Sequence, residues 1–264
     1  MMKSRILLLL AVVVLEACAR VPITGRRQMN LVSEGEMMAM ANTEYAGFLK
    51  ENSPMPAGNA EVVRVRTIGN KLAQAATQFL NDNNAGDRVA GFEWEFNVVN
   101  DPTVNAWCMP GGKVVVYTGI LPVTQNDEGL AVVMGHEIAH AIARHGNERM
   151  SQGLALQGVG MTLEVLNSQN PSAAGNLFLQ SFGIGGQLGM LAYSRKHETE
   201  ADKMGLVFMA MAGYDPREAP KFWQRMSGGG GQAPPEILST HPSDETRVAD
   251  LEAYMPEALK YYKP

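Results

Sequence analysis

The spacing of apolar and polar residues predicts that most of the chain is helical. Ser33 and Glu36 form a capping-box pattern ahead of a helix that runs towards Lys50. A second helix is expected from Ala60 to Leu80. Its predicted inner positions are Val63, Ile68, Leu72 and Ala76. Further helices are predicted at residues 126–150, in Gly-rich segments of 152–192 interrupted at 167–171, at 194–212, after Asp215-Pro216, and from near Ser243 to the C-terminus.

Two short segments have the pattern of strands. Phe92, Trp94, Phe96 and Val98 alternate with polar residues, which is typical of a half-buried strand. The segment from Lys113 to Tyr117 is rich in valine and follows a Pro-Gly-Gly turn, which favours a second strand. We therefore expect a mostly helical α+β domain with a small sheet.

The composition agrees with a globular domain that does not bind nucleic acid. The chain has 264 residues, of which 45% are hydrophobic, so it can bury a sizeable core. Its formal net charge is -5, and its basic residues form no stripe along the sequence. Both features argue against nucleic acid as a partner.

The first residues have the pattern of a secretory signal peptide. Lys3 and Arg5 precede an unbroken apolar run from Ile6 to Leu15. That run is too short to span a bilayer, but its length suits the apolar core of a signal peptide. We therefore expect residues 1–17 to be a signal peptide that is removed from the mature protein.

The end of this segment resembles the lipobox of bacterial lipoproteins. Ala17 precedes Cys18, although Glu16 departs from the small or apolar residue usual at that position. The resemblance implies that Cys18 is lipidated, and the alternative is ordinary cleavage beside an unmodified cysteine. Ala19, rather than Asp, implies anchorage to the outer membrane. Cys108 then has no partner for a disulfide, and we expect it to be a small buried residue rather than a nucleophile.

Candidate chemistry is concentrated in the helix predicted at residues 126–150. His136 and His140 are four residues apart, so they project from one helix face and can reach one metal ion. Glu137 lies about 100° round the helix from His136, where it can face a water on that metal. Zinc lowers the pKa of its bound water to about 7, and a carboxylate can then accept the proton. These three residues predict a hydrolytic zinc site, and the alternative is a surface helix with two incidental histidines.

A catalytic zinc ion needs a third protein ligand, for which residues 194–202 offer candidates. A His-Glu-x-x-His motif followed by a Glu-x-x-x-Asp helix resembles the gluzincin family of CAAX prenyl endopeptidases and HtpX-type membrane proteases. The similarity extends to the periplasmic lipoprotein branch of that family, without an appended helical-repeat array. Three further segments carry the resemblance: residues 21–26, 105–113 and 239–242.

The resemblance implies one catalytic Zn²⁺ ion in a domain whose small sheet flanks the zinc-binding helix. Its ligands would be His136, His140 and Glu198, and Glu137 would be the general base. Asp202 lies one helical turn after Glu198 and would orient a ligating histidine. The rival ligand is Glu200, which lies two residues from Glu198 and therefore points to a different side of the helix.

Two other histidines need separate interpretations. By the same resemblance, His241 lies near zinc, either as a catalytic group that stabilises the oxyanion or protonates the leaving amine, or as a latch on the open zinc position. His145 follows His136 by nine residues, which places it on the opposite face of a continuous helix. We therefore expect His145 to be structural or solvated.

The resemblance also implies a substrate class and a domain plan. Substrates would be unfolded or misassembled cell-envelope proteins in the bacterial periplasm, and the strand from Lys113 to Tyr117 would pair with them as a sheet edge. Residues 18–32 would be a lipidated lead-in and residues 33–264 the peptidase domain. Two alternatives remain: a chaperone-like binding module with an inert or latched zinc site, and a zinc hydrolase of cell-wall peptide crosslinks.

Overall fold

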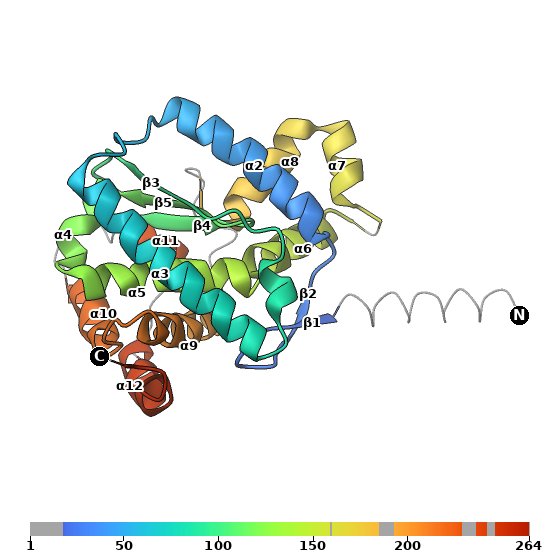
Figure 1. Ribbon diagram of the computed structural model, residues 1–264. Coiled ribbons are helices and arrows are strands. Elements are labelled where there is room, and N and C mark those ends of the chain that lie inside the picture. Colours follow the sequence, from blue (N-terminus) through green and yellow to red (C-terminus); the bar gives the residue numbers. More distant parts are fainter. Residues whose placement is uncertain (1–17, 159, 185–192, 229–235, 242–245, 264) are drawn as a thin grey trace, which may run out of the picture.

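The computed structural model describes residues 18–263, except residues 159, 185–192, 229–235 and 242–245. These residues form the mostly helical α+β fold that the sequence predicts (Figure 1). The predicted signal peptide, residues 1–17, lies outside the described residues. The strands are β1 (Cys18–Arg20), β2 (Arg27–Met29), β3 (Glu95–Val99), β4 (Ala106–Met109) and β5 (Lys113–Tyr117). The helices are α2 (Glu34–Glu51), α3 (Ala60–Asp82), α4 (Leu121–Thr124), α5 (Asp127–Ile142), α6 (His145–Gln157), α7 (Leu163–Gln169), α8 (Pro171–Ser181), α9 (Arg195–Met211), α10 (Glu218–Gly228), α11 (Glu236–Thr240) and α12 (Arg247–Ala258), with 3-10 turns η1 (Gly86–Val89) and η2 (Thr118–Ile120).

The larger sheet has three strands in the order β3-β5-β4. Strand β5 pairs in parallel with β3 and antiparallel with β4, to which the predicted Pro-Gly-Gly turn connects it. The expectation that Lys113–Tyr117 forms a sheet edge is therefore wrong, because this strand lies in the centre. Within the described part of the chain, β4 has β5 as its only strand partner, so β4 is an edge strand.

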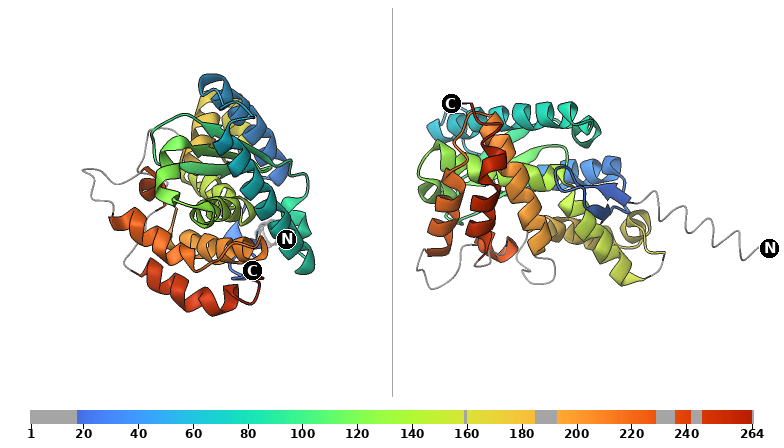
Figure 2. Two further views of the ribbon diagram at one scale, coloured as in Figure 1. Left: turned by 60° about the vertical axis from the view of Figure 1, so that its left-hand side comes forward. Right: turned by 90° about the horizontal axis from the view of Figure 1, so that it is seen from below.

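This sheet separates two hydrophobic cores. Phe96 and Val98 face the larger core with residues of α3, α5 and α9, whereas Val99 faces a second core with residues of α2, α6 and α8. Figure 2 (left) shows the same order of layers, with α2 above the sheet and the C-terminal helices on the far side of α5. Helices thus cover both faces of the sheet, as is typical of buried strands.

The strand predicted at 92–98 is partly wrong in its start and in its polar face. The strand begins only at Glu95, and the polar Asn97 is buried like its apolar neighbours. Its side-chain amide donates to the Tyr45 hydroxyl at 2.9 Å, which satisfies it on the α2 side of the sheet. Of the polar residues in the alternation, Asn97 is covered, whereas the Glu93 and Glu95 side chains are 88% and 44% exposed.

The first two long helices follow the prediction closely. Ser33 Oγ accepts a hydrogen bond from the Glu36 amide, and the Glu36 carboxylate accepts one from the Ser33 amide, which completes the predicted capping box of α2. In α3, Ile68, Leu72 and Ala76 are buried as predicted, but Val63 is 52% exposed. The adjacent Val62 and Val65 occupy the inner face instead.

The helix predicted at 126–150 is interrupted, which corrects the sequence analysis. Helix α5 ends at Ile142, and Arg144 adopts a left-handed conformation with φ of 61° before α6 begins. This conformation is costly for a non-glycine residue and ends the helical hydrogen-bond pattern. The Arg144 guanidinium pairs with Glu34 at 3.3 Å, which ties the break to α2. The break changes the direction of the chain before α6. The position of His145 therefore cannot be predicted from its spacing to His136 in a continuous helix.

The C-terminal region packs against α5 and α9. Helix α9 lies within the helix predicted at 194–212 and is capped by Ser194, and Asp215 accepts a hydrogen bond from the Arg217 amide just before α10. The short α11 was not anticipated, and the last helix begins at Arg247 within the described residues, whereas the predicted start at Ser243 lies outside them. In the described part of the chain, every helix is too short or too polar to cross a bilayer.

Candidate metal centre

Helix α5 carries two histidines into the interior. Asn126 caps the helix through a 2.7 Å hydrogen bond from the Gly129 amide, and every residue from Gly129 to Ile142 is buried. His136 and His140 lie one turn apart, with their Nε2 atoms 3.0 Å from each other. The predicted placement on one helix face therefore holds.

Helix α9 brings a carboxylate to these histidines. Glu198 Oε2 lies 3.3 Å from His136 Nε2, and Oε1 lies 3.4 Å from His140 Nε2. The approach is close because two glycines meet where α5 and α9 cross. A Cβ atom built on Gly205 would lie only 3.1 Å from the His136 backbone nitrogen, and one on Gly135 would lie 3.3 Å from the Gly205 carbonyl oxygen.

His241 follows α11 and completes the cluster. Its Nδ1 atom lies 3.3 Å from His136 Nε2 and 3.1 Å from Glu198 Oε1. One ligand atom from each of His136, His140, Glu198 and His241 lies within 4.8 Å of the others. Zinc is held at about 2.0–2.1 Å by nitrogen and oxygen, which separates tetrahedral ligands by about 3.3 Å, so this donor set fits zinc.

The protonation of His140 and Glu198 suits a metal site. Burial opposes a charge on His136, but Asp202 and Glu198 raise its pKa to about 9, so this imidazole gives up a proton when a metal binds. Burial lowers the pKa of His140 well below its usual value, which favours the neutral imidazole that a metal binds. Burial opposes the charge on Glu198, but the histidines beside it, His241 foremost, lower its pKa well below the usual range. A neutral imidazole and an ionised carboxylate are the ligand forms that zinc requires.

Glu137 lies beside the cluster without belonging to it. Its side chain is buried, its Oε1 atom has no hydrogen-bond partner among the described residues, and His241 Nε2 lies 3.6 Å from that atom. Burial raises the pKa of this carboxyl. A carboxylate with a raised pKa accepts a proton more readily near neutral pH, which suits a general base.

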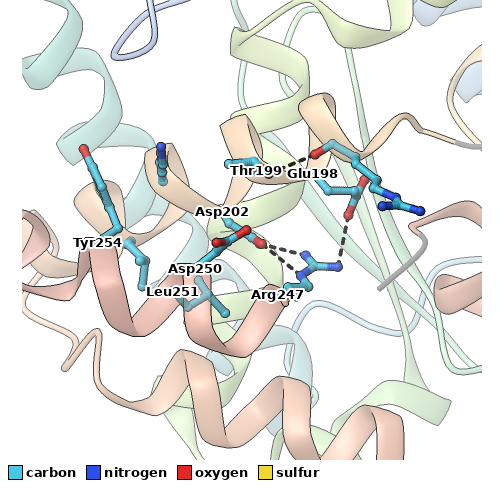
Figure 3. Close-up of a pocket in the computed structure, with 10 residues that line it drawn as sticks. Glu198, Thr199, Asp202, Arg247, Asp250, Leu251 and Tyr254 are labelled. Carbon is cyan, nitrogen blue, oxygen red and sulfur yellow. Dashed lines mark hydrogen bonds and ion pairs between the residues drawn. The ribbon is translucent and has the colours of Figure 1, made fainter. Parts of the chain in front are cut away.

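A buried carboxylate, held by an arginine, orients the His136 ring through its Nδ1 atom. His136 Nδ1 lies 2.9 Å from Asp202 Oδ1, the neighbour that the sequence analysis expected. Arg247 donates to both Asp202 oxygens at 2.7 and 2.9 Å and lies 3.1 Å from Glu198 Oε2 (Figure 3). Its guanidinium also stacks on the Trp223 ring, 3.3 Å from the centroid. Sequence reasoning missed Arg247, because it lies 45 residues beyond Asp202 in a segment without a motif.

His140 is oriented by a different residue. Its Nδ1 lies 2.9 Å from His145 Nδ1, and His145 Nε2 lies 2.9 Å from Glu200 Oε2. Burial lowers the pKa of His145 to about 4, so this ring is neutral. The prediction that His145 lies on the opposite face is wrong, because the break at Arg144 turns it back towards the site. Glu200, the rival ligand, contacts His145 instead of the cluster.

An aromatic ring lies against His140, and the two cysteines lie apart from the cluster. The centroid of the Tyr193 ring lies 4.0 Å from that of the His140 ring, and the Arg149 guanidinium lies 4.0 Å from the same Tyr193 centroid. Cys108 is buried, as predicted, and burial raises the pKa of its thiol well above the usual value. The backbone of Cys18 lies in β1, but its side chain is outside the described residues, so its lipidation stays a prediction.

Comparison with known proteins places this chain in a family. The model for peptidase family M48 matches residues 63–255. The chain is 34% identical over 244 residues to mitochondrial metalloendopeptidase OMA1 of Schizosaccharomyces pombe, covering 90% of this chain and 66% of that protein. The chain is 33% identical over 254 residues to mitochondrial metalloendopeptidase OMA1 of Saccharomyces cerevisiae, covering 92% of this chain and 71% of that protein.

A bacterial protein is also similar. The chain is 27% identical over 234 residues to the beta-barrel assembly-enhancing protease of Escherichia coli, covering 87% of this chain and 46% of that protein. The chain therefore spans about two thirds of the yeast relatives and under half of this bacterial relative. The relatives include mitochondrial and bacterial proteins, so the predicted lipoprotein branch within the family stays a prediction.

Proposed function

The chain belongs to peptidase family M48, which makes it an enzyme of the metalloendopeptidase class, and we propose that it hydrolyses peptide bonds of unfolded or misassembled cell-envelope proteins. One Zn²⁺ ion would be held by His136, His140 and Glu198. The observation that carries this proposal is the convergence of these side chains with Glu137 beside them in one buried cluster. A purely structural zinc site has no use for the Glu137 carboxylate.

The chain's own residues have distinct tasks in this reaction. When bound, zinc would polarise the scissile carbonyl and lower the pKa of the attacking water. Glu137 takes the proton of that water and passes it to the leaving amine. Asp202 and Arg247 keep the His136 ring in one tautomer and orientation, and His145 does the same for His140.

His241 supports two versions of the proposal. Its Nδ1 atom lies 3.1–3.3 Å from ligand atoms of the cluster, which suits a latch that occupies the fourth zinc position until substrate displaces it. Its Nε2 atom lies 3.6 Å from Glu137, which suits a group that stabilises the oxyanion or helps to protonate the leaving amine. The latch predicts that removal of the imidazole raises activity, and the catalytic role predicts that it lowers activity.

The substrate would bind as an added strand. Strand β4, rather than the predicted β5, is an edge strand among the described residues, and it packs against α5, which carries the zinc-binding histidines. Because its four residues are buried, substrate would have to displace the part of the chain that covers this edge. Backbone pairing with β4 would select extended, unfolded segments with little dependence on their side chains. This mode of binding agrees with misfolded proteins as substrates.

The proposed location is the bacterial periplasm, with Cys18 lipidated and anchored to the outer membrane. The signal-peptide pattern of residues 1–17 and the Ala17-Cys18 sequence support this proposal. A relative named as a beta-barrel assembly-enhancing protease agrees with a role in envelope quality control. Residues 33–264 would form the peptidase domain, with residues 18–32 as its lead-in.

Degradation of casein by the purified, zinc-loaded protein tests the proposed function. We expect wild type to cleave casein and Glu137→Gln to be about 10²–10⁴-fold slower at equal zinc content, because the general base is lost. Glu252→Gln, at an exposed position of α12, is the matched control and should cleave like wild type.

The other outcomes separate the alternatives. If neither wild type nor Glu137→Gln cleaves, His241→Ala decides between a latched enzyme, which it would activate, and a binding module, which would stay inert. Equal cleavage by wild type and Glu137→Gln would contradict the proposed mechanism. Cleavage of cell-wall peptide crosslinks but not of casein would contradict the proposed substrate class.

A further inference from the structure

The segment between β1 and β2 reaches the periphery of the metal centre. Strands β1 and β2 form an antiparallel hairpin, and Figure 1 shows them beside α6. The loop of this hairpin, residues 21–26, sends two side chains towards α9. Thr24 Oγ1 donates to Glu200 Oε1 at 2.7 Å, and Arg26 donates to Glu200 Oε1 and Oε2 at 2.8 and 2.9 Å.

Arg26 also bridges α9 to α6. Its guanidinium donates two hydrogen bonds to Glu148, at 2.8 and 2.7 Å, in addition to those that Glu200 accepts. Both carboxylates are buried, with side chains 8% and 4% exposed. Paired buried charges hold a defined geometry, whereas an unpaired one is strongly unfavourable. The loop therefore fixes the position of Glu200 relative to both helices.

Glu200 is connected to a proposed zinc ligand, His140, through hydrogen bonds of His145. Glu200 Oε2 accepts from His145 Nε2 at 2.9 Å, so the free Nδ1 of His145 accepts from His140 Nδ1 at 2.9 Å. His140 Nε2 then faces the cluster as a lone-pair donor. The His145 ring is also stacked on His197 at 4.5 Å, and His197 Nε2 lies 3.0 Å from Glu148. Thus both carboxylates bound by Arg26 support the same imidazole.

We propose that loop 21–26 is a positioning element of the metal centre, and that its displacement weakens zinc retention through Glu200, His145 and His140. This inference rests on the proposed function of the cluster as a zinc site. Cys18 lies in β1, three residues before the loop begins, so attachment of the chain at that residue would act next to the loop. The loop would thereby couple the attachment of the N-terminal segment to the state of the zinc site.

Zinc dissociation from two loop variants tests the coupling. Arg26→Lys keeps the positive charge, but an ammonium group cannot donate paired hydrogen bonds to both carboxylates as the planar guanidinium does. Thr24→Val removes one hydrogen bond to Glu200 while retaining the shape of the side chain. Residues that orient metal ligands contribute about 10–100-fold to metal affinity. We expect transfer of zinc to a chelator to be about 10-fold faster for Arg26→Lys and about threefold faster for Thr24→Val.

Two further readouts separate positioning from general stability. Arg27→Lys, at an exposed neighbour in β2, should release zinc at the wild-type rate. The visible absorption of the Co²⁺-loaded protein should change for Arg26→Lys and not for Arg27→Lys, because it reports the ligand geometry. Coupling is reciprocal, so zinc loading of wild type should also slow amide hydrogen exchange in residues 21–26.

The outcomes distinguish this inference from the proposed function. If wild type binds no zinc, the proposed function fails. If wild type binds zinc and both loop variants release it within about twofold of the wild-type rate, with an unchanged Co²⁺ spectrum, the proposed coupling is wrong and the loop only stabilises the fold. Should Arg26→Lys fail to fold, Thr24→Val decides, since Thr24 lies at an exposed position of the loop.

Discussion

The two histidines of α5 depend on different neighbours outside the cluster. His136 is held by Asp202 and Arg247, and His140 is held by His145. In both cases a hydrogen bond at Nδ1 leaves Nε2 directed at the other ligands. The metal centre is therefore a buried network of side chains, in which residues without a direct bond to zinc determine ligand geometry.

Arg247→Lys tests this arrangement at the residue scale. A lysine keeps the charge but loses the paired hydrogen bonds to Asp202 and the stacking on Trp223. We expect about 10–100-fold weaker zinc binding, measured by competition with a chromogenic chelator. Arg217→Lys makes the same change in an exposed Arg–Asp pair on the surface and should alter zinc affinity less than twofold. Equal effects of the two variants would remove Arg247 from the metal centre.

Sequence reasoning identified residues whose positions depend on local geometry. His136 and His140 belong to one helix turn, so their common face follows from their spacing. Glu198 and His241 required a family resemblance, because α9 and α11 reach the site through tertiary packing. No sequence pattern indicated that Arg247 belongs to the site, since only the packing of α12 on α9 brings it to Asp202.

At the scale of elements, the crossing of α5 and α9 determines the spacing of the ligands. Gly135 and Gly205 allow the two backbones to approach each other. Gly135 precedes His136 in α5, and Gly205 lies in α9 between Asp202 and the C-terminal end of the helix. A side chain at either glycine would separate the helices. The distance between His136 and Glu198 thus depends on two residues that carry no functional group.

Gly205→Ala tests this crossing. The added Cβ would meet the His136 backbone nitrogen at 3.1 Å and the Gly135 carbonyl carbon at 3.2 Å, and backbone atoms cannot rotate away. We expect a loss of about 1–3 kcal/mol in the free energy of unfolding, together with weaker zinc binding. Urea denaturation and chelator competition measure the two effects.

Gly47→Ala is the control for this substitution. Gly47 lies in α2, and a Cβ atom added there would have no other atom within 4 Å. Alanine should therefore stabilise the helix by about 0.5–1 kcal/mol without changing zinc affinity. A Gly205→Ala protein as stable as wild type, with unchanged zinc affinity, would show that the crossing tolerates a methyl group.

The element-level errors share one cause, which is that neighbouring segments override a local pattern. The pattern at 126–150 is continuously helical, yet Arg144 breaks the helix where α2 supplies Glu34 as an ion-pair partner. The segment 92–98 alternates in residue type, yet the strand covers 95–99, and helices bury both faces from Phe96 to Val99. Capping of α2 was predicted correctly because it involves residues only three positions apart.

At the scale of the whole molecule, the site lies where parts distant in sequence converge on α5. Helix α9 contributes Glu198, the segment after α11 contributes His241, and α12 contributes Arg247. The hairpin at the N-terminal end contacts the same network through Glu200. Within the predicted lead-in, residues 18–32, Arg26 contacts α6 and α9 through Glu148 and Glu200.

The most direct test of the zinc centre is an anomalous difference map at the zinc absorption edge, from crystals of the zinc-loaded protein. We predict one zinc peak per chain, about 2.0–2.2 Å from His136 Nε2, His140 Nε2 and a carboxylate oxygen of Glu198. A peak bound instead by Glu200 or Glu148, or no peak among the side chains of the cluster, would contradict the proposed centre.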